Sequence, residues 1–267
     1  MGIIMTDIIY AVAIVGIIGL IFGLLLSFAS VIFKVETDER ETKITEVLPG
    51  ANCGGCGYAG CSAYAAAVVS GSAPVNACSV GKDAVAAKIA EIMGVKAEKS
   101  EPMTARVLCA GDCENAPDKF LYMGNEDCRT AARLSGGQKA CPNGCLGFGS
   151  CVKVCKFGAI SVINGIARVD EEKCTACGAC VKTCPKHIIE LIPQKSKYYV
   201  QCKNTEKGAQ TIKNCKLGCI GCKKCENVCP AEAVKVTDNL AAIDYSKCIS
   251  CGSCAEVCPR KIIAAEV

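Results

Sequence analysis

Two stretches, CIGCKKCENVCP at residues 219–230 and CISCGSCAEVCP at residues 248–259, repeat one arrangement of cysteines. In each stretch three cysteines are separated by two residues, a fourth follows after three more, and a proline comes directly after it. Four thiols in so short a run suit one shared inorganic centre better than disulfides, whose geometry requires separate pairs. The spacing C-x2-C-x2-C-x3-C-Pro is specific to iron–sulfur ligation, so these stretches predict iron–sulfur centres.

This spacing is the bacterial two-cluster ferredoxin pattern, in which three close cysteines bind one [4Fe-4S] cluster and the fourth crosses to the other. The ligands predicted for one cluster are Cys219, Cys222, Cys225 and Cys258. Those predicted for the other are Cys248, Cys251, Cys254 and Cys229. Tight loops of this kind point backbone N–H groups at the sulfurs, which stabilises a negatively charged cluster.

The same cysteine pattern occurs once more, 74 positions earlier in the chain. The cysteines that recur at this offset are Cys128, Cys141, Cys145, Cys151, Cys155, Cys174, Cys177, Cys180 and Cys184, which match Cys202, Cys215, Cys219, Cys225, Cys229, Cys248, Cys251, Cys254 and Cys258. A duplicated, thiol-rich unit indicates a scaffold for metal centres that carry electrons. The pattern breaks at one position, where Phe148 stands in place of a counterpart to Cys222.

The first copy predicts a complete ligand set for one cluster: Cys155, Cys174, Cys177 and Cys180. Its partner set has only three members, Cys145, Cys151 and Cys184, because phenylalanine cannot ligate iron. Cys141 is the nearest substitute and is predicted as the fourth ligand. A three-iron centre, or a cluster with a non-protein ligand, remains an alternative. Cys215 occupies the position equivalent to Cys141 although Cys222 is present, and Lys156 stands where the other runs have proline.

A separate four-thiol set lies nearer the N-terminus, in the glycine-rich stretch GANCGGCGYAGC at residues 50–61. Its cysteines are Cys53, Cys56, Cys61 and Cys78. Glycines let the backbone wrap closely around a ligand, and no histidine or carboxylate accompanies the thiols. One [4Fe-4S] cluster is therefore predicted here, with structural zinc as the alternative. The whole chain is thus predicted to bind five [4Fe-4S] clusters.

Five cysteines remain without an assigned ligand role: Cys109, Cys113, Cys128, Cys202 and Cys215. Cys109 and Cys113 could join Cys128 in a further centre, or all five could be plain buried thiols. His187 is not predicted as a ligand, because its counterpart in the second copy is Lys261. The sequence shows neither a phosphate-binding loop nor a nucleophile–base pair, so no nucleotide site or catalytic residue is predicted.

The composition is that of an iron–sulfur protein from a reducing compartment. The chain has 267 residues with 25 cysteines, one histidine and no tryptophan. Thiolate-bound clusters require a compartment in which disulfides are rare. The formal charge of +4 is not informative, because cluster-bound thiolates add negative charge that residue counting ignores. Nothing in the sequence indicates nucleic-acid binding.

An uncharged segment from Ile8 to Phe33 predicts an N-terminal transmembrane helix, since it is long enough to span a hydrocarbon core of about 30 Å. Lys34, Arg40 and Lys43 follow the segment, whereas no basic residue precedes it. The positive-inside rule therefore predicts a single-pass protein of the cell membrane, with the bulk of the chain on the cytoplasmic side.

The predicted fold class is α+β, built from small iron–sulfur domains. We expect a transmembrane helix at 1–33, a juxtamembrane linker at 34–47, a 4Fe-4S domain with short helices at 48–94, a connector at 95–127, and tandem ferredoxin-like 2[4Fe-4S] modules at 128–201 and 202–267. In the 48–94 domain the expected helices begin near Ser62, which would act as a cap, and at Asp83. Each module should contain a short hairpin, with its turn at residues 164–165 or 238–239.

The membrane segment, the 50–61 motif with Cys78, and the ferredoxin repeats together resemble the B subunit of the Rnf complex, over essentially the whole chain. Shorter members of that family carry one two-cluster module, so this chain resembles the extended form. The resemblance implies a component of an ion-translocating ferredoxin:NAD⁺ oxidoreductase, coupled to Na⁺ or H⁺. Soluble ferredoxin is implied as the electron donor, and the flavin and NAD sites are implied to lie on partner subunits.

The rival interpretation is a ferredoxin-like component of another membrane redox complex, of the formate dehydrogenase or hydrogenase type. The generic two-cluster modules support it, but it leaves the 50–61 motif without an explanation. A purely structural metal-binding protein is a third, weaker interpretation.

Overall fold

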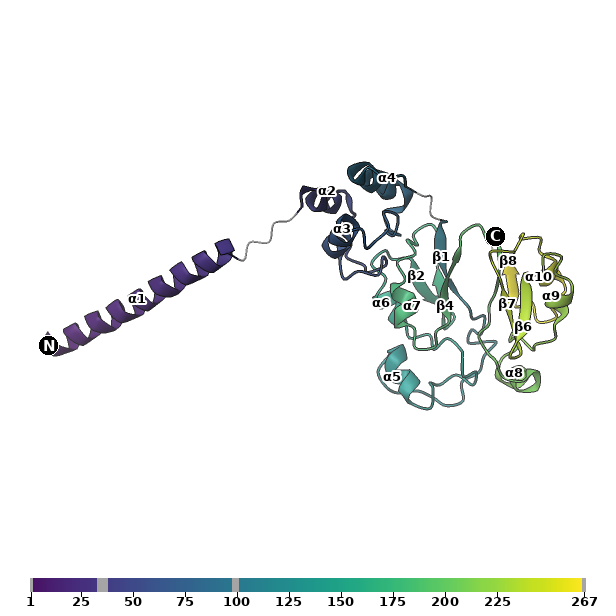
Figure 1. Ribbon diagram of the computed structural model, residues 1–267. Coiled ribbons are helices and arrows are strands. Elements are labelled where there is room, and N and C mark those ends of the chain that lie inside the picture. Colours follow the sequence, from purple (N-terminus) through teal and green to yellow (C-terminus); the bar gives the residue numbers. More distant parts are fainter. Residues whose placement is uncertain (1, 33–37, 98–100, 266–267) are drawn as a thin grey trace.

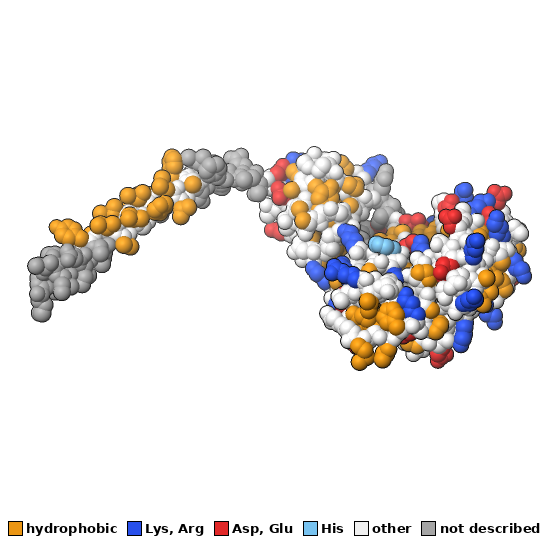
Figure 2. Space-filling view, turned by 90° about the horizontal axis from the view of Figure 1, so that it is seen from below, with side chains coloured by type: hydrophobic (Ala, Val, Ile, Leu, Met, Phe, Trp, Pro, Cys, Tyr) orange, Lys and Arg blue, Asp and Glu red, His pale blue; other side chains and the backbone are white. Residues whose placement is uncertain are grey.

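The computed structural model describes residues 2–32, 38–97 and 101–265. Helix α1 (Gly2–Ile32) comes first, and its described apolar side chains are uncovered, as at Leu26 with 70% of its surface exposed (Figure 2). In the part of the chain whose side chains are described, no helix is both long and apolar enough to cross a bilayer. The predicted span from Ile8 to Phe33 therefore stays a prediction, and Phe33 lies outside the described residues.

The N-terminal unit consists of three helices: α2 (Glu39–Val47), α3 (Cys61–Val69) and α4 (Lys82–Met93). Their apolar faces meet in one core, in which Ile44 of α2, Tyr64 of α3 and Ile89 of α4 are fully buried. Residues 39–47 are therefore not the solvated linker that the sequence predicted. Their polar residues face outward, while Ile44 attaches the segment to the unit. Residues 34–37 of the predicted linker lie outside the described residues.

The two helices predicted for this unit are present, but the cap of the first differs from the expected one. Helix α3 begins at Cys61 rather than Ser62, and no side chain of the preceding residue caps it. Instead the side-chain oxygen of Asn52 accepts a hydrogen bond from the backbone N–H of Cys61, at 2.8 Å. The glycine-rich loop is therefore tied directly to the start of α3.

The first module is built around two antiparallel strand pairs (Figure 1). Strands β2 (Ile160–Ile163) and β3 (Ile166–Val169) form the predicted hairpin, whose turn residues Asn164 and Gly165 both have positive φ. Strand β1 (Met103–Val107) pairs with β4 (Ile189–Pro193). The helices are short: α5 (Cys128–Arg133), α6 (Ser150–Lys153) and α7 (Ala179–Thr183). Since β1 comes from the predicted connector, part of the connector belongs to this module.

The second module repeats this plan. Strands β6 (Val234–Thr237) and β7 (Leu240–Ile243) form the second predicted hairpin, and β5 (Tyr198–Val200) pairs with β8 (Ile263–Ala265). Its helices are α8 (Gly208–Asn214), α9 (Lys224–Asn227) and α10 (Ser253–Glu256). Strand β5 takes the place that β1 holds in the first module, so the structural repeat starts earlier in each copy than the cysteine register indicated.

The first module lies between the N-terminal unit and the second module (Figure 1). Apolar and charged contacts join the two modules. The guanidinium of Arg106 on β1 lies 5.2 Å from the ring centre of Tyr199 on β5, a cation–π distance. Lys203 forms an ion pair with Glu190 of β4. The modules are thus held in a defined arrangement, which brings cysteines from both of them together.

Candidate metal centres

The four cysteines of the glycine-rich motif surround one hollow in the N-terminal unit. They form the N-terminal site: Cys53, Cys56, Cys61 and Cys78. The backbone N–H of Gly81 donates to the sulfur of Cys78 at 3.4 Å. Tyr64, beneath the site, donates from its hydroxyl to the carbonyl of Pro74 and accepts from the N–H of Ala77, which fixes the loop before Cys78. The structure thus brings together the set predicted from the sequence.

The first module contains the regular set that the sequence predicted, here called the Cys174 site. It comprises Cys155, Cys174, Cys177 and Cys180, which line a single hollow. Backbone N–H groups of Ala159 and Ala105 donate to the sulfurs of Cys155 and Cys174, at 3.3 and 3.4 Å. The donor Ala105 lies on β1, so the connector strand supports this site directly.

In the irregular set of the first module, the thiol that lies beside the three predicted cysteines is one to which the sequence assigned no role. This Cys145 site comprises Cys128, Cys145, Cys151 and Cys184, all lining one hollow. The structure does not bring Cys141 to this hollow. Phe148, at the position of the missing ligand, instead packs its ring against Tyr122, with 5.2 Å between the ring centres.

A short hydrogen-bond network fixes Cys128 beside this hollow. The carboxylate of Asp127 caps α5 by accepting from the backbone N–H groups of Arg129 and Thr130. The same carboxylate accepts from the hydroxyl of Ser150, at 2.8 Å. That hydroxyl oxygen accepts from the N–H of Cys128, also at 2.8 Å. Since Ser150 directly precedes Cys151, the network holds two members of the Cys145 site at a fixed separation.

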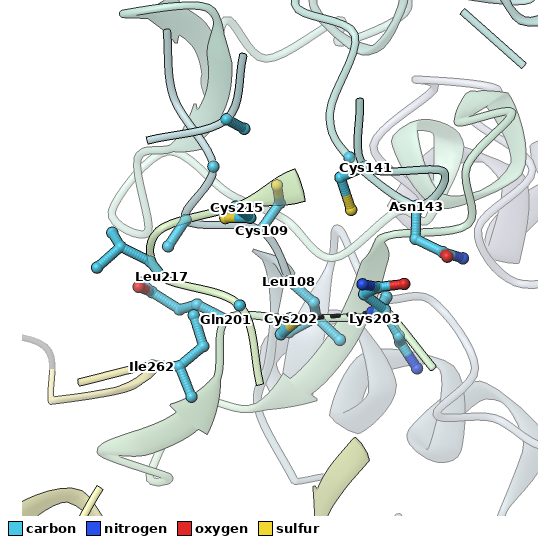
Figure 3. Close-up of a pocket in the computed structure, with 16 residues that line it drawn as sticks. Leu108, Cys109, Cys141, Asn143, Gln201, Cys202, Lys203, Cys215, Leu217 and Ile262 are labelled. Atoms are coloured by element: carbon cyan, nitrogen blue, oxygen red, sulfur yellow. Dashed lines mark hydrogen bonds between the residues drawn. The ribbon is translucent and has the colours of Figure 1, made fainter. Parts of the chain in front are cut away.

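Cys141 lies in a different hollow, between the two modules. Figure 3 shows four cysteines around it, each on its own segment, and they define the bridging site: Cys109, Cys141, Cys202 and Cys215. All four are buried. The pKa of Cys141 is raised to about 11, mainly by burial. The neighbouring thiols Cys202 and Cys215 also raise it. The sequence had predicted no ligand role for the other three residues of this site.

The bridging site has an internal symmetry that relates the two modules. Cys109 comes two residues after β1, and Cys202 comes two residues after β5. The sulfur of Cys109 accepts from the N–H of Cys145 at 3.5 Å, and the sulfur of Cys202 accepts from the N–H of Cys219 at 3.4 Å. Cys109 is therefore the structural counterpart of Cys202, although the 74-residue register paired Cys202 with Cys128.

The second module brings together both of its predicted sets. The Cys219 site comprises Cys219, Cys222, Cys225 and Cys258, and the Cys248 site comprises Cys229, Cys248, Cys251 and Cys254. Burial, and then the proximity of Cys219, Cys222 and Cys258, raises the pKa of Cys225 to about 11. The pKa of Cys254 is also raised, mainly by burial and then by its neighbouring thiols, which include Cys248, Cys251 and Cys229.

These sites suit four-thiol clusters in their chemistry. The bridging, Cys145, N-terminal and Cys174 hollows each have a volume of about 20 Å³, so four different parts of the chain form hollows of nearly the same size, each lined by four thiols. Among the described residues, no group of three or more His, Cys, Asp or Glu side chains is spaced to hold a single metal ion. Six sets of four account for every cysteine except Cys113, which is exposed. Each set can supply four thiolates to one [4Fe-4S] cluster.

Neighbouring sites are joined by direct contacts. The backbone N–H of Cys145 donates a hydrogen bond to the sulfur of Cys109, which joins the Cys145 site to the bridging site. In the same way the N–H of Cys219 donates to the sulfur of Cys202, which joins the Cys219 site to the bridging site. Within each module, the last cysteine of each run belongs to the other site of the pair. The loop of the N-terminal site reaches the Cys174 site, where Gly55 lies against the backbone of Cys177. The six sites therefore form one row: N-terminal, Cys174, Cys145, bridging, Cys219 and Cys248.

Cys128→Ser should remove or convert the cluster of the Cys145 site, because serine is a poor replacement for a buried thiolate ligand. Iron and acid-labile sulfide of anaerobically purified protein, with EPR of the reduced form, would measure this effect. Cys113→Ser is the matched control and should leave both unchanged, since Cys113 belongs to no site. If Cys128→Ser behaved like the control, Cys128 would not be a ligand.

The thiol-lined turns and paired hairpins define the class of protein: a ferredoxin-type iron–sulfur protein with several cluster domains. Matches to family models agree with this class. The Fe-S cluster model matches residues 48–80, the 4Fe-4S binding domain matches residues 167–190, and the 4Fe-4S dicluster domain matches residues 218–263.

Relatives identify the particular family. The chain is 45% identical over 237 residues to the B subunit of the Na⁺-translocating ferredoxin:NAD⁺ oxidoreductase complex of Acetobacterium woodii, covering 88% of this chain and 71% of the relative. It is 42% identical over 238 residues to the B subunit of the ion-translocating oxidoreductase complex of Methanosarcina acetivorans, covering 89% and 90%. It is 45% identical over 244 residues to the B subunit of the proton-translocating ferredoxin:NAD⁺ oxidoreductase complex of Clostridium ljungdahlii, covering 91% and 86%. The chain belongs to this family of B subunits, as the resemblance indicated.

Proposed function

We propose that this chain carries electrons from reduced ferredoxin to partner subunits of an ion-translocating ferredoxin:NAD⁺ oxidoreductase. The activities for which the relatives are named support the proposal, and the observation that carries it is the unbroken row of six thiol sites. A [4Fe-4S] cluster supplies one-electron redox chemistry when bound. The chain contributes the thiolate ligands, the backbone N–H groups that stabilise sulfur charge, and the short separations between neighbouring sites.

We propose six [4Fe-4S] clusters rather than the five predicted from the sequence. The reason is that Cys128 can complete the Cys145 site. Cys141 is then available to the bridging site, together with three thiols that had no assigned role. A cluster between the modules would also close the gap in the row between the Cys145 and Cys219 sites.

The exposure of the cysteines and the predicted membrane segment support a direction of electron flow. Cys222 and Cys251 of the second module are exposed, whereas the bridging cysteines are all buried. A soluble donor would therefore approach the second module most closely. Exposed basic residues in that module, Lys223, Lys224 and Lys261, would favour an acidic donor surface. We further propose that α1 anchors the chain in the cell membrane, with the bulk on the cytoplasmic side, and that electrons leave through the N-terminal site towards membrane partners.

Anaerobically purified protein should contain about 24 iron atoms per chain, four for each of six sites, and reduced ferredoxin should bleach its visible absorbance. Iron and sulfide analysis and stopped-flow absorbance measure the two outcomes. Iron near 20 would return the assignment to five clusters. A fully loaded chain that ferredoxin cannot reduce would contradict the proposed donor.

A further inference from the structure

The first module departs from its motif at a position that faces the N-terminal unit. Three of the four cysteine runs end in Cys-Pro, but Cys155 is followed by Lys156. The ammonium group of Lys156 donates to the backbone carbonyl of Ala51 at 2.9 Å and to that of Asn52 at 3.4 Å. The counterpart of Lys156 in the second module is Pro230, which has no ammonium group to donate.

The carbonyls that Lys156 contacts belong to the loop of the N-terminal site. Asn52 directly precedes Cys53, and its side chain holds the N–H of Cys61. Lys156 itself directly follows Cys155, a member of the Cys174 site. A single side chain therefore links the backbone next to one ligand of each site.

Gly55 provides a second contact between the same two loops. A Cβ added at Gly55 would lie 3.0 Å from both the Cα and the carbonyl oxygen of Cys177, and 3.0 Å from the hydroxyl of Ser79. The φ of Gly55 is not positive, so the close approach of Cys177 and Ser79, and not the backbone conformation, favours glycine at this position. The backbone between Cys53 and Cys56 thus touches the backbone of Cys177 with no side chain between them.

The duplicated module shows what this contact changes. Cys177 is half-buried, whereas its counterpart Cys251 is exposed, because no further described unit covers the second module there. Beside the contact, the N-terminal unit and the first module enclose an open cavity of about 480 Å³, lined by residues that include Gly55, Ser79 and Thr175. The approach of the two loops therefore depends on a few local contacts, among them those of Gly55 and Lys156.

We propose that Gly55 and Lys156 are positioning residues for electron transfer between the Cys174 site and the N-terminal site. Gly55 allows the two ligand loops to touch, and Lys156 holds them in that position. Because electron tunnelling weakens steeply with distance, loss of either feature slows transfer without removing a ligand. This inference rests on the proposed function, since it concerns one step in the proposed path.

The test uses the full-length chain loaded anaerobically, with Gly55→Val to separate the loops and Lys156→Pro to remove the link. Lys156→Pro makes this cysteine run end in Cys-Pro, as the other three runs do, so the variant should still bind its clusters. The matched controls are Ala59→Val, which adds bulk at an exposed position of the same loop, and Lys153→Ala, which removes a neighbouring exposed lysine. Lys156→Arg, which keeps a long cationic donor, should restore much of the wild-type behaviour.

Three measurements distinguish positioning from a general structural role. Iron content should remain that of the wild type in the Gly55, Lys156, Ala59 and Lys153 variants. The EPR spectrum of the N-terminal cluster is obtained after dithionite reduction by subtracting the spectrum of Cys56→Ala protein. Spin–spin coupling to the neighbouring cluster should broaden this spectrum in the wild type. The broadening should be lost in Gly55→Val and Lys156→Pro only. Hydrogen exchange of the amides in residues 51–57 should accelerate in the same two variants.

Wild-type broadening and exchange in Gly55→Val and Lys156→Pro would overturn the inference, as would equal changes in the controls. Because dithionite replaces ferredoxin in these measurements, the result does not depend on the donor. Failure of ferredoxin to reduce the chain would contradict the proposed function alone. In freeze-quench experiments, the two variants should show slowed reduction of the N-terminal cluster, while the module clusters are reduced at the wild-type rate.

Discussion

Cys202→Ser is expected to divide the row of sites into two electrically separate parts. Cys202 lines the bridging site, and its sulfur accepts a hydrogen bond from the N–H of Cys219, so its loss should remove the bridging site. Iron should fall by about four atoms per chain. Reduced ferredoxin should still reduce the second module within the wild-type time, whereas reduction of the first module and the N-terminal unit should be lost. Freeze-quench EPR measures both halves separately.

Cys141→Ser should reproduce the Cys202→Ser result, because both residues line the same hollow although they lie in different modules. The five-cluster assignment makes a different prediction, namely that Cys141→Ser affects the Cys145 site and that Cys202→Ser affects no cluster. Cys113→Ser again serves as the control. Undiminished reduction of the N-terminal unit in Cys202→Ser would show that electrons bypass the bridging site.

Cys56→Ala in the intact complex should abolish ferredoxin-dependent NAD⁺ reduction. Cys56 belongs to the N-terminal site, which we place at the end of the row and next to the membrane partners. The clusters of both modules should remain present and reducible by ferredoxin, because their ligands lie elsewhere. The measurement combines the NAD⁺ reduction assay with EPR of the modules. Full NAD⁺ reduction in this variant would place the N-terminal site outside the electron path.

Most structural features that depend on residues close together in the sequence were predicted correctly. The two hairpins formed where β-branched runs flank Asn164-Gly165 and Asp238-Asn239. The thiols of the four regular sets lie together, because they are close in sequence or related by the crossover between paired runs. Their role as ligands stays a prediction. Helices α3 and α4 of the N-terminal unit were also predicted, whereas α2 lies in the segment predicted as a linker. The cap of α3 was not predicted, since Asn52 reaches α3 from a loop nine residues earlier.

The bridging site was beyond this kind of prediction because it depends on strand pairing over long distances. Cys109 reaches it only because β1 pairs with β4, which lies more than eighty residues further along the chain. The 74-residue register also gave a wrong equivalence between the modules. It aligned Cys202 with Cys128, whereas Cys109 is the structural counterpart of Cys202. The equivalence shows only in the structure, where a strand ends two residues before each of these cysteines.

The division of the bridging ligands between two modules has a consequence for cofactor maturation during synthesis. Cys109 and Cys141 leave the ribosome before Cys202 and Cys215, so the bridging site has only two of its four thiols until the second module has been translated. The N-terminal site, by contrast, is complete once Cys78 has emerged. Insertion of a cluster between the modules must therefore follow their docking. A chain that stopped after the first module would keep the thiols of its other sites but only Cys109 and Cys141 of the bridging set, and so could not hold the proposed bridging cluster.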